Sequence, residues 1–239
     1  MRFWLVLSTL SPAGSSFPPE GLAVLKWLLY AVVKTVCFGW FCVFNRLSRE
    51  GIDHIPRRGA FILAANHCSN LDPVVVGAAC PRRLRFMAKE ELFRVPLLGT
   101  LIDALGAVSV PRSDRQGAAA VLRLTLSRLE AAESVLVFPE GTRSRDGRLG
   151  KLEGGVALLA IKTGLPVIPV FLSGTFEALP SGASFPRPSK IRLRFGEPLE
   201  AAFWSDLPER EARQAFLCAL EERFRALESS SGGARSDSE

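Results

Sequence analysis

Short apolar runs alternate with helical patterns along this chain from about residue 49 onward. Apolar runs bounded by turn residues are typical of buried strands, and apolar positions recurring every three to four residues are typical of amphipathic helices. The pattern predicts strands near 60–65, 84–87, 106–110, 134–138, 166–172 and 190–195. It predicts helices near 73–80, 90–104 (with a break at Pro96), 114–131, 153–162 and 208–227. Such alternation indicates an α/β fold, a single domain with a largely parallel central sheet covered by helices.

The stretch before this domain is strongly apolar. Residues 22–44 are mostly Leu, Val, Phe and Trp, and a stretch of this length suffices to cross a bilayer. Lys26, Tyr30 and Lys34 would share one narrow side of a helix, however, and a lysine at the bilayer centre costs about 2.5–3.5 kcal/mol. We therefore expect a helix that lies in the membrane interface with its lysines reaching the headgroups. A single membrane span and a soluble core helix are the alternatives.

These patterns divide the chain into three parts. We expect an N-terminal membrane-associated segment over residues 1–48, an α/β domain over 49–228, and a disordered tail rich in Ser and Gly over 229–239. The chain of 239 residues is long enough for one domain with a substantial core. Residues 1–10 are short and apolar, so a cleaved signal peptide is an alternative for the N-terminus.

Composition narrows the classes of partner and site. The formal net charge of +6 points to an anionic partner, and recognisable nucleic-acid motifs are absent, so a membrane surface with phosphorylated substrates explains the charge more simply than nucleic acid. Five cysteines show no zinc-like spacing, and their odd number argues against a complete disulfide framework. Reduced thiols place the folded domain on the cytoplasmic side. Two histidines exclude a histidine-rich metal site.

A polar segment with candidate chemistry follows the predicted strand 60–65. It reads Asn66-His67-Cys68-Ser69-Asn70-Leu71-Asp72. We expect Asp72 to be the N-cap of the next helix and Pro73 its first residue. An aspartate at that place can hold one imidazole nitrogen of His67 while the other nitrogen takes a proton from a substrate hydroxyl. The alternative is an ordinary turn whose polar residues only cap the helix.

A second polar segment follows the predicted strand 134–138. It reads Pro139-Glu140-Gly141-Thr142-Arg143-Ser144. A Glu and an Arg on either side of a Gly give a hydrogen-bond acceptor and a planar cation beside exposed backbone, which suits a polyol phosphate. Taken alone, the segment is also compatible with an ordinary polar turn. Binding sites of parallel sheets gather at the carboxyl ends of the strands, where both segments are expected.

Together the two segments closely resemble the glycerolipid acyltransferase family, whose best-known members acylate 1-acylglycerol-3-phosphate. Residues 106–112 and 165–170 resemble the second and fourth blocks of that family, in the same order. The resemblance runs from about Arg49 to Pro198. Pro111 departs from the family pattern, where an acidic residue is more usual, and a proline removes a backbone donor.

The resemblance implies a role for each site residue. His67 would be the general base, and Asp72 would orient it and stabilise the imidazolium. The residues expected to bind the glycerol phosphate of the acceptor are Glu140, Gly141, Thr142, Arg143, Arg112 and Lys89. The resemblance further implies that residues 49–228 form the acyltransferase domain, and that backbone N–H groups near the first segment hold the oxyanion.

The expected reaction moves a fatty acyl group from acyl-CoA or acyl carrier protein to the free hydroxyl of a lysophospholipid, and yields phosphatidic acid. No metal or redox cofactor is expected, because the reaction needs only proton transfer and charge stabilisation. Nothing resembling Gly-x-Ser-x-Gly surrounds Ser69 or Ser144, so an acyl-enzyme on either is not expected. Glycerol-3-phosphate or a lyso-aminolipid as acceptor, a hydrolase, and a non-catalytic membrane adaptor that binds anionic lipid are the alternatives. We expect a membrane-associated enzyme whose active site lies on the cytoplasmic face.

Overall fold

One seven-stranded sheet organises the part of the chain that the computed structural model describes, which comprises residues 20–96, 98–110, 115–180, 183 and 185–232. Its strand order is β1-β7-β6-β2-β5-β3-β4. The strands are β1 (Ser48–Glu50), β2 (Ile62–Ala65), β3 (Arg85–Lys89), β4 (Ala107–Val110), β5 (Val135–Val137), β6 (Val167–Ser173) and β7 (Arg192–Phe195). The strands from β6 to β4 are parallel, whereas β7 runs antiparallel to β6. The prediction of an α/β domain with a largely parallel sheet is confirmed.

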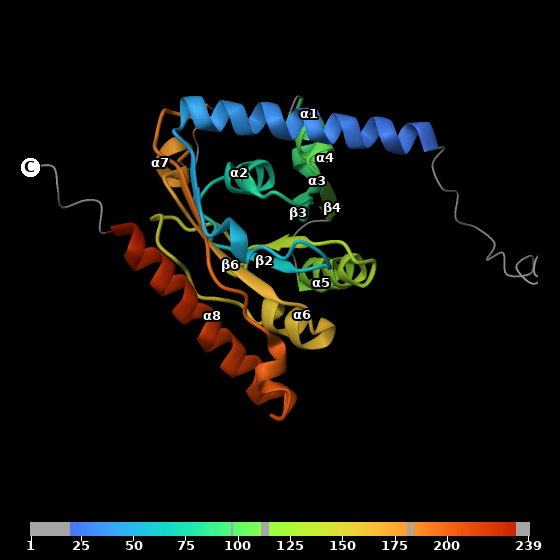
Figure 1. Ribbon diagram of the computed structural model, residues 1–239, viewed down its shortest axis with the longest axis vertical. Coiled ribbons are helices and arrows are strands. Elements are labelled where there is room, and N and C mark those ends of the chain that lie inside the picture. The colour runs from blue at the N-terminus through green and yellow to red at the C-terminus, as the bar shows by residue number, and fades with distance from the viewer. Residues whose placement is uncertain (1–19, 97, 111–114, 181–182, 184, 233–239) are drawn as a thin grey trace, which may run out of the picture.

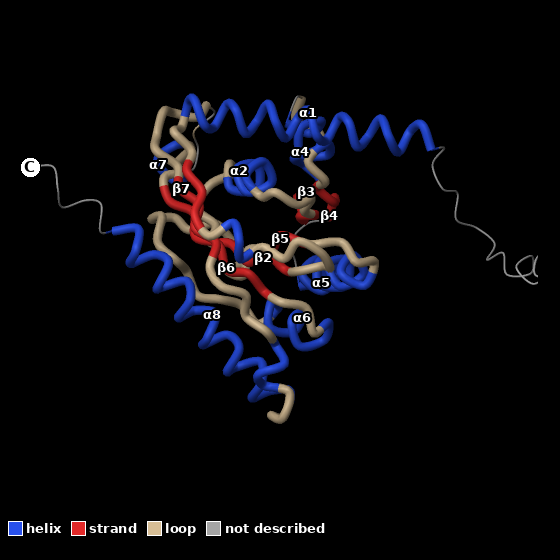
Figure 2. The backbone as a smooth tube through the Cα atoms, in the orientation of Figure 1, coloured by secondary structure: helices blue, strands red, loops and turns tan. Residues whose placement is uncertain are grey.

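Helices cover both faces of the sheet (Figures 1 and 2). They are α1 (Glu20–Phe44), α2 (Asp72–Ala79), α3 (Glu90–Phe93), α4 (Leu98–Ala104), α5 (Arg115–Glu130), α6 (Gly155–Thr163), α7 (Thr175–Ala178) and α8 (Glu209–Gly232). Helix α2 packs on one face of the sheet, and α1 crosses over α2 as an outer layer. Helices α5, α6 and α8 cover the other face.

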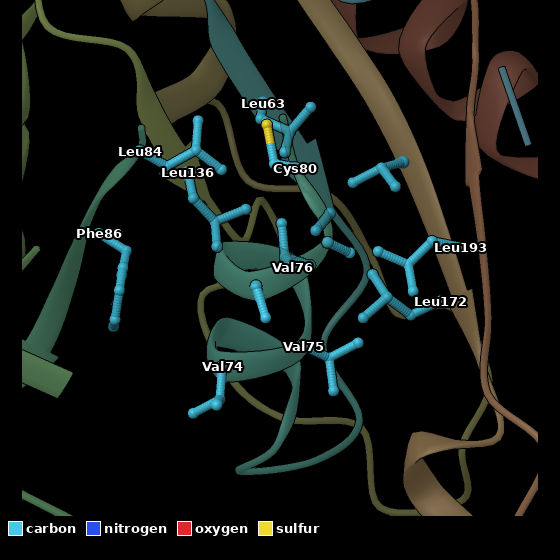
Figure 3. Packing of buried hydrophobic residues seen from close by; sticks show 14 of the residues in the cluster. Leu63, Val74, Val75, Val76, Cys80, Leu84, Phe86, Leu136, Leu172 and Leu193 are labelled. Atoms are coloured by element: carbon cyan, nitrogen blue, oxygen red, sulfur yellow. The ribbon is translucent and has the colours of Figure 1, made fainter. Parts of the chain in front are cut away.

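The central strand β2 is buried on both faces, which explains why all four of its residues are apolar. Leu63 packs in the cluster that includes Val74, Val75 and Val76 of α2, as Figure 3 shows. Ile62 points to the opposite cluster, beneath α6 and α8. Burying an aliphatic side chain of this size contributes about 1.5–3 kcal/mol to folding. These contacts fix the carboxyl end of β2, and with it the position of the residue that follows.

The predicted strands and helices are present, with ends that shift by a few residues. The helix predicted over 90–104 is interrupted between α3 and α4, where Pro96 lies. The pattern does not predict β1 or α7, because three or four residues are too few to display a period. Helix α8 runs to Gly232, so residues 229–232 of the expected disordered tail are helical. Residues 1–19 and 233–239 lie outside the described residues.

Helix α1 confirms the predicted helix over 22–44, but its polar side faces the domain. Tyr30 is buried, and the Lys34 ammonium donates a hydrogen bond to the carbonyl oxygen of Cys80, at the C-terminal end of α2. A cation is favourable there because the last carbonyl groups of a helix carry partial negative charge. Burial lowers the pKa of Lys34. The expectation that this lysine reaches lipid headgroups is therefore wrong, and the side chain of Lys26 lies outside the described residues.

The opposite side of α1 is apolar and exposed. Its large side chains are between 48% and 86% exposed, namely Leu28, Leu29, Val32, Val36, Trp40 and Val43. Within the described ranges, no helix combines the length and hydropathy that crossing a membrane requires.

Candidate active site

The carboxyl ends of β2, β5, β3 and β4 meet at one edge of the sheet, because these strands are parallel. His67 follows β2 by two residues, and the segment from Phe138 to Ser144 follows β5, the neighbour of β2. Lys89 is the last residue of β3. Both polar segments and one candidate cation therefore lie at the carboxyl ends of the parallel strands, as predicted from the sequence.

His67 and Asp72 form a hydrogen-bonded pair. His67 Nδ1 lies 2.8 Å from Asp72 Oδ2, and the side chains of the two residues are 18% and 0% exposed. Because a carboxylate accepts hydrogen bonds, we assign the ring proton to Nδ1, which leaves the lone pair of Nε2 free to take a proton. The Phe138 ring stacks on the His67 imidazole, with the ring centroids 4.0 Å apart and an angle of 22° between the ring planes.

The Asp72 carboxylate also shapes the loop in front of it. Its Oδ2 accepts the backbone N–H groups of Cys68 and Ser69, each at 2.7 Å. The N-cap of α2 is Leu71, so the prediction that Asp72 caps this helix is wrong, and Pro73 is its second residue. The physical reason is that the carboxylate turns back toward the loop rather than toward the free N–H groups of the helix. Backbone N–H groups near this segment were expected to hold the oxyanion, and those of Cys68 and Ser69 are already engaged within the protein.

Asn66 holds the end of β2 against β6. Its Nδ2 donates to the carbonyl oxygen of Leu172 at 3.0 Å, and its Oδ1 accepts the Leu172 N–H at 2.7 Å. The amide thus replaces one rung of the backbone ladder and is itself buried. Sequence reasoning did not assign a function to Asn66 or to Phe138. The available signal was their place at the ends of neighbouring strands. For Asn66 the reason is that a polar residue at the end of a buried strand needs a hydrogen-bond partner.

The loop after β5 is tied directly to His67. Glu140 is buried, its Oε1 accepts the His67 N–H at 2.7 Å, and its Oε2 accepts the Gly150 N–H at 2.7 Å. The Ser144 N–H in turn donates to the His67 carbonyl oxygen at 2.7 Å. Burial is the largest influence on the pKa of Glu140 and raises it, while the two backbone donors act in the opposite direction. The loop is therefore joined to the His67 backbone by two hydrogen bonds.

The exposed part of this loop carries cations. Gly141 adopts a left-handed conformation with φ of 67°, which favours glycine, and Thr142 and Arg143 after it are exposed. Within the part of the chain that the structure describes, no hydrogen bond or ion pair holds the Arg143 guanidinium. Further exposed cations of the same loop are Arg145, Arg148 and Lys151.

The other two predicted phosphate ligands are Lys89 and Arg112, and the structure describes only Lys89. Lys89 is exposed at the end of β3 and pairs in register with Val110, the last residue of β4. Arg112 follows Val110 by two residues and lies outside the described residues. Lys89 thus lies at the carboxyl end of β3, and phosphate binding by Lys89 and by Arg112 stays a prediction.

Two other potential nucleophiles of this segment, the Cys68 thiol and the Ser69 hydroxyl, are buried. Burial, followed by the nearby Asp72 carboxylate, raises the pKa of the Cys68 thiol to about 12. The Ser69 hydroxyl is buried and donates to the carbonyl oxygen of Leu179 at 3.0 Å. Among the described residues, no group of three or more His, Cys, Asp or Glu side chains is placed so as to hold a metal ion.

The chain is similar in sequence to acyltransferases from a plant and a bacterium. The chain resembles a chloroplastic 1-acyl-sn-glycerol-3-phosphate acyltransferase of Arabidopsis thaliana, with 33% identity over 59% of this chain and 39% of the relative. A 1-acyl-sn-glycerol-3-phosphate acyltransferase of Bacillus subtilis is 28% identical over 74% of this chain and 85% of the relative. The chain thus spans well under half the length of the Arabidopsis relative and most of the bacterial one.

A solved structure has the same fold. The crystal structure of the 1-acyl-sn-glycerophosphate (LPA) acyltransferase PlsC from Thermotoga maritima superposes with a TM-score of 0.71 at 29% identity, and the match covers 90% of this chain and 84% of that one. A model of the family described as Acyltransferase matches residues 46–173, more than half of the chain, and includes both polar segments of the site. The chain therefore belongs to the Acyltransferase family.

Proposed function

We propose that the protein transfers a fatty acyl group from an acyl thioester to the free hydroxyl of 1-acylglycerol-3-phosphate, which makes phosphatidic acid. The observation that carries the proposal is the His67–Asp72 pair, whose partly exposed imidazole lies beside a cationic loop. The names of the relatives in the plant, the bacterium and the solved structure support this choice of acceptor.

In the proposed mechanism His67 Nε2 removes the proton from the acceptor hydroxyl. The oxygen attacks the thioester carbonyl carbon, the tetrahedral intermediate collapses with cleavage of the C–S bond, and the thiolate leaves with the proton returned by the imidazolium. Asp72 holds the ring in the productive tautomer and stabilises the imidazolium. The negative charge on the carbonyl oxygen is met by donors other than the N–H groups of Cys68 and Ser69, which Asp72 occupies.

Arg143 is the proposed main ligand of the acceptor phosphate. It is exposed, it follows the left-handed Gly141, and its planar guanidinium can bind a phosphate through two parallel hydrogen bonds. Lys89 would add a point charge from the end of β3, and Arg112 would add a second guanidinium. Gly141 and Thr142 would bring the backbone close to the phosphate.

The exposed apolar side of α1 is the proposed membrane contact. Val36 and Trp40 lie on it and are 64% and 53% exposed, and a contiguous apolar face of this kind marks an interaction surface. A lysophospholipid acceptor resides in a bilayer, so an interfacial helix would bring the site to its substrate. The cysteines within the described residues are free thiols, which fits an active site on the cytoplasmic face.

The test is a panel of acceptors with one labelled acyl thioester and the purified protein. The acceptors are 1-acylglycerol-3-phosphate, glycerol-3-phosphate and a lyso-aminolipid, with products resolved by mass and thiol release followed in parallel. We expect phosphatidic acid from the first acceptor, formed about 10²- to 10⁴-fold more slowly with His67→Ala. Thiol release without any acceptor would instead identify a hydrolase. Anionic-lipid binding without turnover would identify an adaptor, and either result would refute the proposal.

A further inference from the structure

Glu140 lies between two segments of the site rather than at its open surface. It follows β5 by three residues, it is 7% exposed, and its two carboxylate oxygens point to opposite partners. Oε1 accepts the N–H of His67, and Oε2 accepts the N–H of Gly150, both at 2.7 Å. The sequence predicted that this carboxylate binds the glycerol of the acceptor. Burial and two short backbone hydrogen bonds give it a different set of partners.

We infer that Glu140 is a positioning residue, which sets the place of the catalytic base relative to the phosphate-binding loop. The inference rests on the proposed function and deepens it. One end of the carboxylate fixes the peptide that carries His67, and the other end fixes the far end of the loop that carries Arg143. Glu140 thus contributes to the distance between the base and the bound phosphate.

Two backbone hydrogen bonds hold the loop near the Glu140 carboxylate. The Glu153 N–H donates to the Pro139 carbonyl oxygen at 2.7 Å, next to Glu140, and the Ser144 N–H donates to the His67 carbonyl oxygen at 2.7 Å. The His67 N–H thus donates to Glu140, and the His67 carbonyl oxygen accepts from Ser144. Arg143 immediately precedes Ser144, so the phosphate ligand and the base are linked through a short chain of hydrogen bonds.

Gly150 supplies an independent observation. Its backbone does not occupy the left-handed region, so its conformation alone does not require glycine. A Cβ atom at this position would lie 2.7 Å from Glu140 Oε2, closer than Cβ atoms approach other heavy atoms. The missing side chain therefore makes room for the carboxylate. A substitution at Gly150 displaces Glu140 without changing any group that the proposed mechanism places on the substrate.

Glutamine cannot reproduce the bridge. Two N–H donors face the two ends of the Glu140 side chain, and a carboxylate accepts at both ends. An amide accepts at one end only and presents its own N–H₂ at the other, where two donors would meet. Glu140→Gln therefore breaks one half of the bridge at nearly constant volume.

The experiment compares Glu140→Gln, Gly150→Ala and the double variant in steady-state acyl transfer to 1-acylglycerol-3-phosphate. Gly154→Ala is the matched control, because a Cβ at that exposed glycine meets no atom within 4 Å. We expect each single variant to lower kcat by about 10- to 100-fold, since small displacements of a base cost this much. The double variant should be no worse than the worse single variant, because both break the same bridge. The control should match the wild type.

A second readout does not depend on turnover. Hydrogen exchange of the His67 and Gly150 amides, followed by NMR on the full chain, should quicken at one or both of these amides in Glu140→Gln and stay unchanged in Gly154→Ala. In Gly150→Ala, whose Cβ displaces the carboxylate, exchange of the His67 amide should quicken. If Gly150→Ala keeps the wild-type kcat and a protected His67 amide while Glu140→Gln only raises the acceptor KM, then Glu140 contacts the acceptor and the inference is wrong. If the wild type transfers to no acceptor, the proposed function fails, and the amide readout still decides whether the bridge exists.

Discussion

Replacing Asp72 with Asn tests the charge of the orienting carboxylate while keeping its shape. Asp72 Oδ2 accepts three hydrogen bonds, from His67 Nδ1 and from the N–H groups of Cys68 and Ser69. The amide oxygen of Asn can occupy the same place and accept from the same donors. The substitution therefore removes the negative charge and keeps an acceptor for the three hydrogen bonds. Asp72→Ala is less informative, because each buried N–H that loses its partner costs about 1–3 kcal/mol.

The expected loss follows from the geometry of the pair. Once His67 takes the proton, an imidazolium stands beside the carboxylate, with charge centres about 4 Å apart. Such a pair attracts by about 4 kcal/mol at an effective dielectric constant of about 20. The side chains are 18% and 0% exposed, so solvent screens them only in part. Because about 1.4 kcal/mol corresponds to a tenfold change in rate, kcat should fall about a thousandfold.

The assay is thiol release at saturating acceptor, with thermal unfolding of each variant measured in parallel. His67→Ala should fall to a similar level, and the double variant should be little lower, because the two residues act as a unit. An Asp72→Asn variant that melts like the wild type and keeps more than about a tenth of its kcat would refute the role assigned to the carboxylate.

Three further outcomes are expected. Arg143→Lys should raise the acceptor KM and barely change the thioester KM, because lysine keeps the charge and loses the planar fork; equal effects on both substrates would place Arg143 on the wrong one. Val36→Glu with Trp40→Glu should reduce flotation with anionic liposomes and leave turnover of dispersed short-chain acceptors intact, since both side chains are exposed on α1; unchanged flotation at high salt would place the membrane contact elsewhere. Burial raises the pKa of the Cys68 thiol to about 12 and so disfavours its reactive thiolate, so iodoacetamide followed by peptide mass analysis should label the exposed Cys218 before Cys68; equal labelling would contradict the burial of Cys68.

The position of the site was predictable because it depends on local patterns. Apolar runs indicate where the parallel strands end, and parallel strands place their carboxyl ends at one edge of the sheet. His67 and Arg143 follow a predicted strand and Lys89 lies near the end of one. The local sequence pattern therefore suffices to place all three near the carboxyl ends of strands. The pairing of His67 with Asp72 was predictable for the same reason, since the two residues lie five positions apart in one loop and the helix start that follows it.

The partners of the buried polar groups were not predictable in this way. Asn66 meets Leu172 across 106 residues of sequence, and Glu140 meets His67 across 73. A sequence pattern identifies that a polar residue ends a buried strand, but the partner that satisfies it depends on which strands become neighbours and how the loops turn. For this reason we infer a positioning role for Glu140, whereas the sequence predicted a substrate ligand; its place after the end of β5 was expected.

The same limit explains the reversed orientation of α1. The spacing of Tyr30 and Lys34 predicts one narrow polar side, and a period alone cannot identify what that side faces. Lipid headgroups and the end of another helix both offer negative charge to a lysine, and here the end of α2 lies within reach, with the Arg83 guanidinium 5.0 Å from the centre of the Tyr30 ring. Once the polar side packs inward, the apolar side must face outward. The proposed membrane contact therefore rests on the exposed apolar residues and not on the lysines, and charge reversal at Lys34 should disturb the packing of α1 on α2 more than lipid binding.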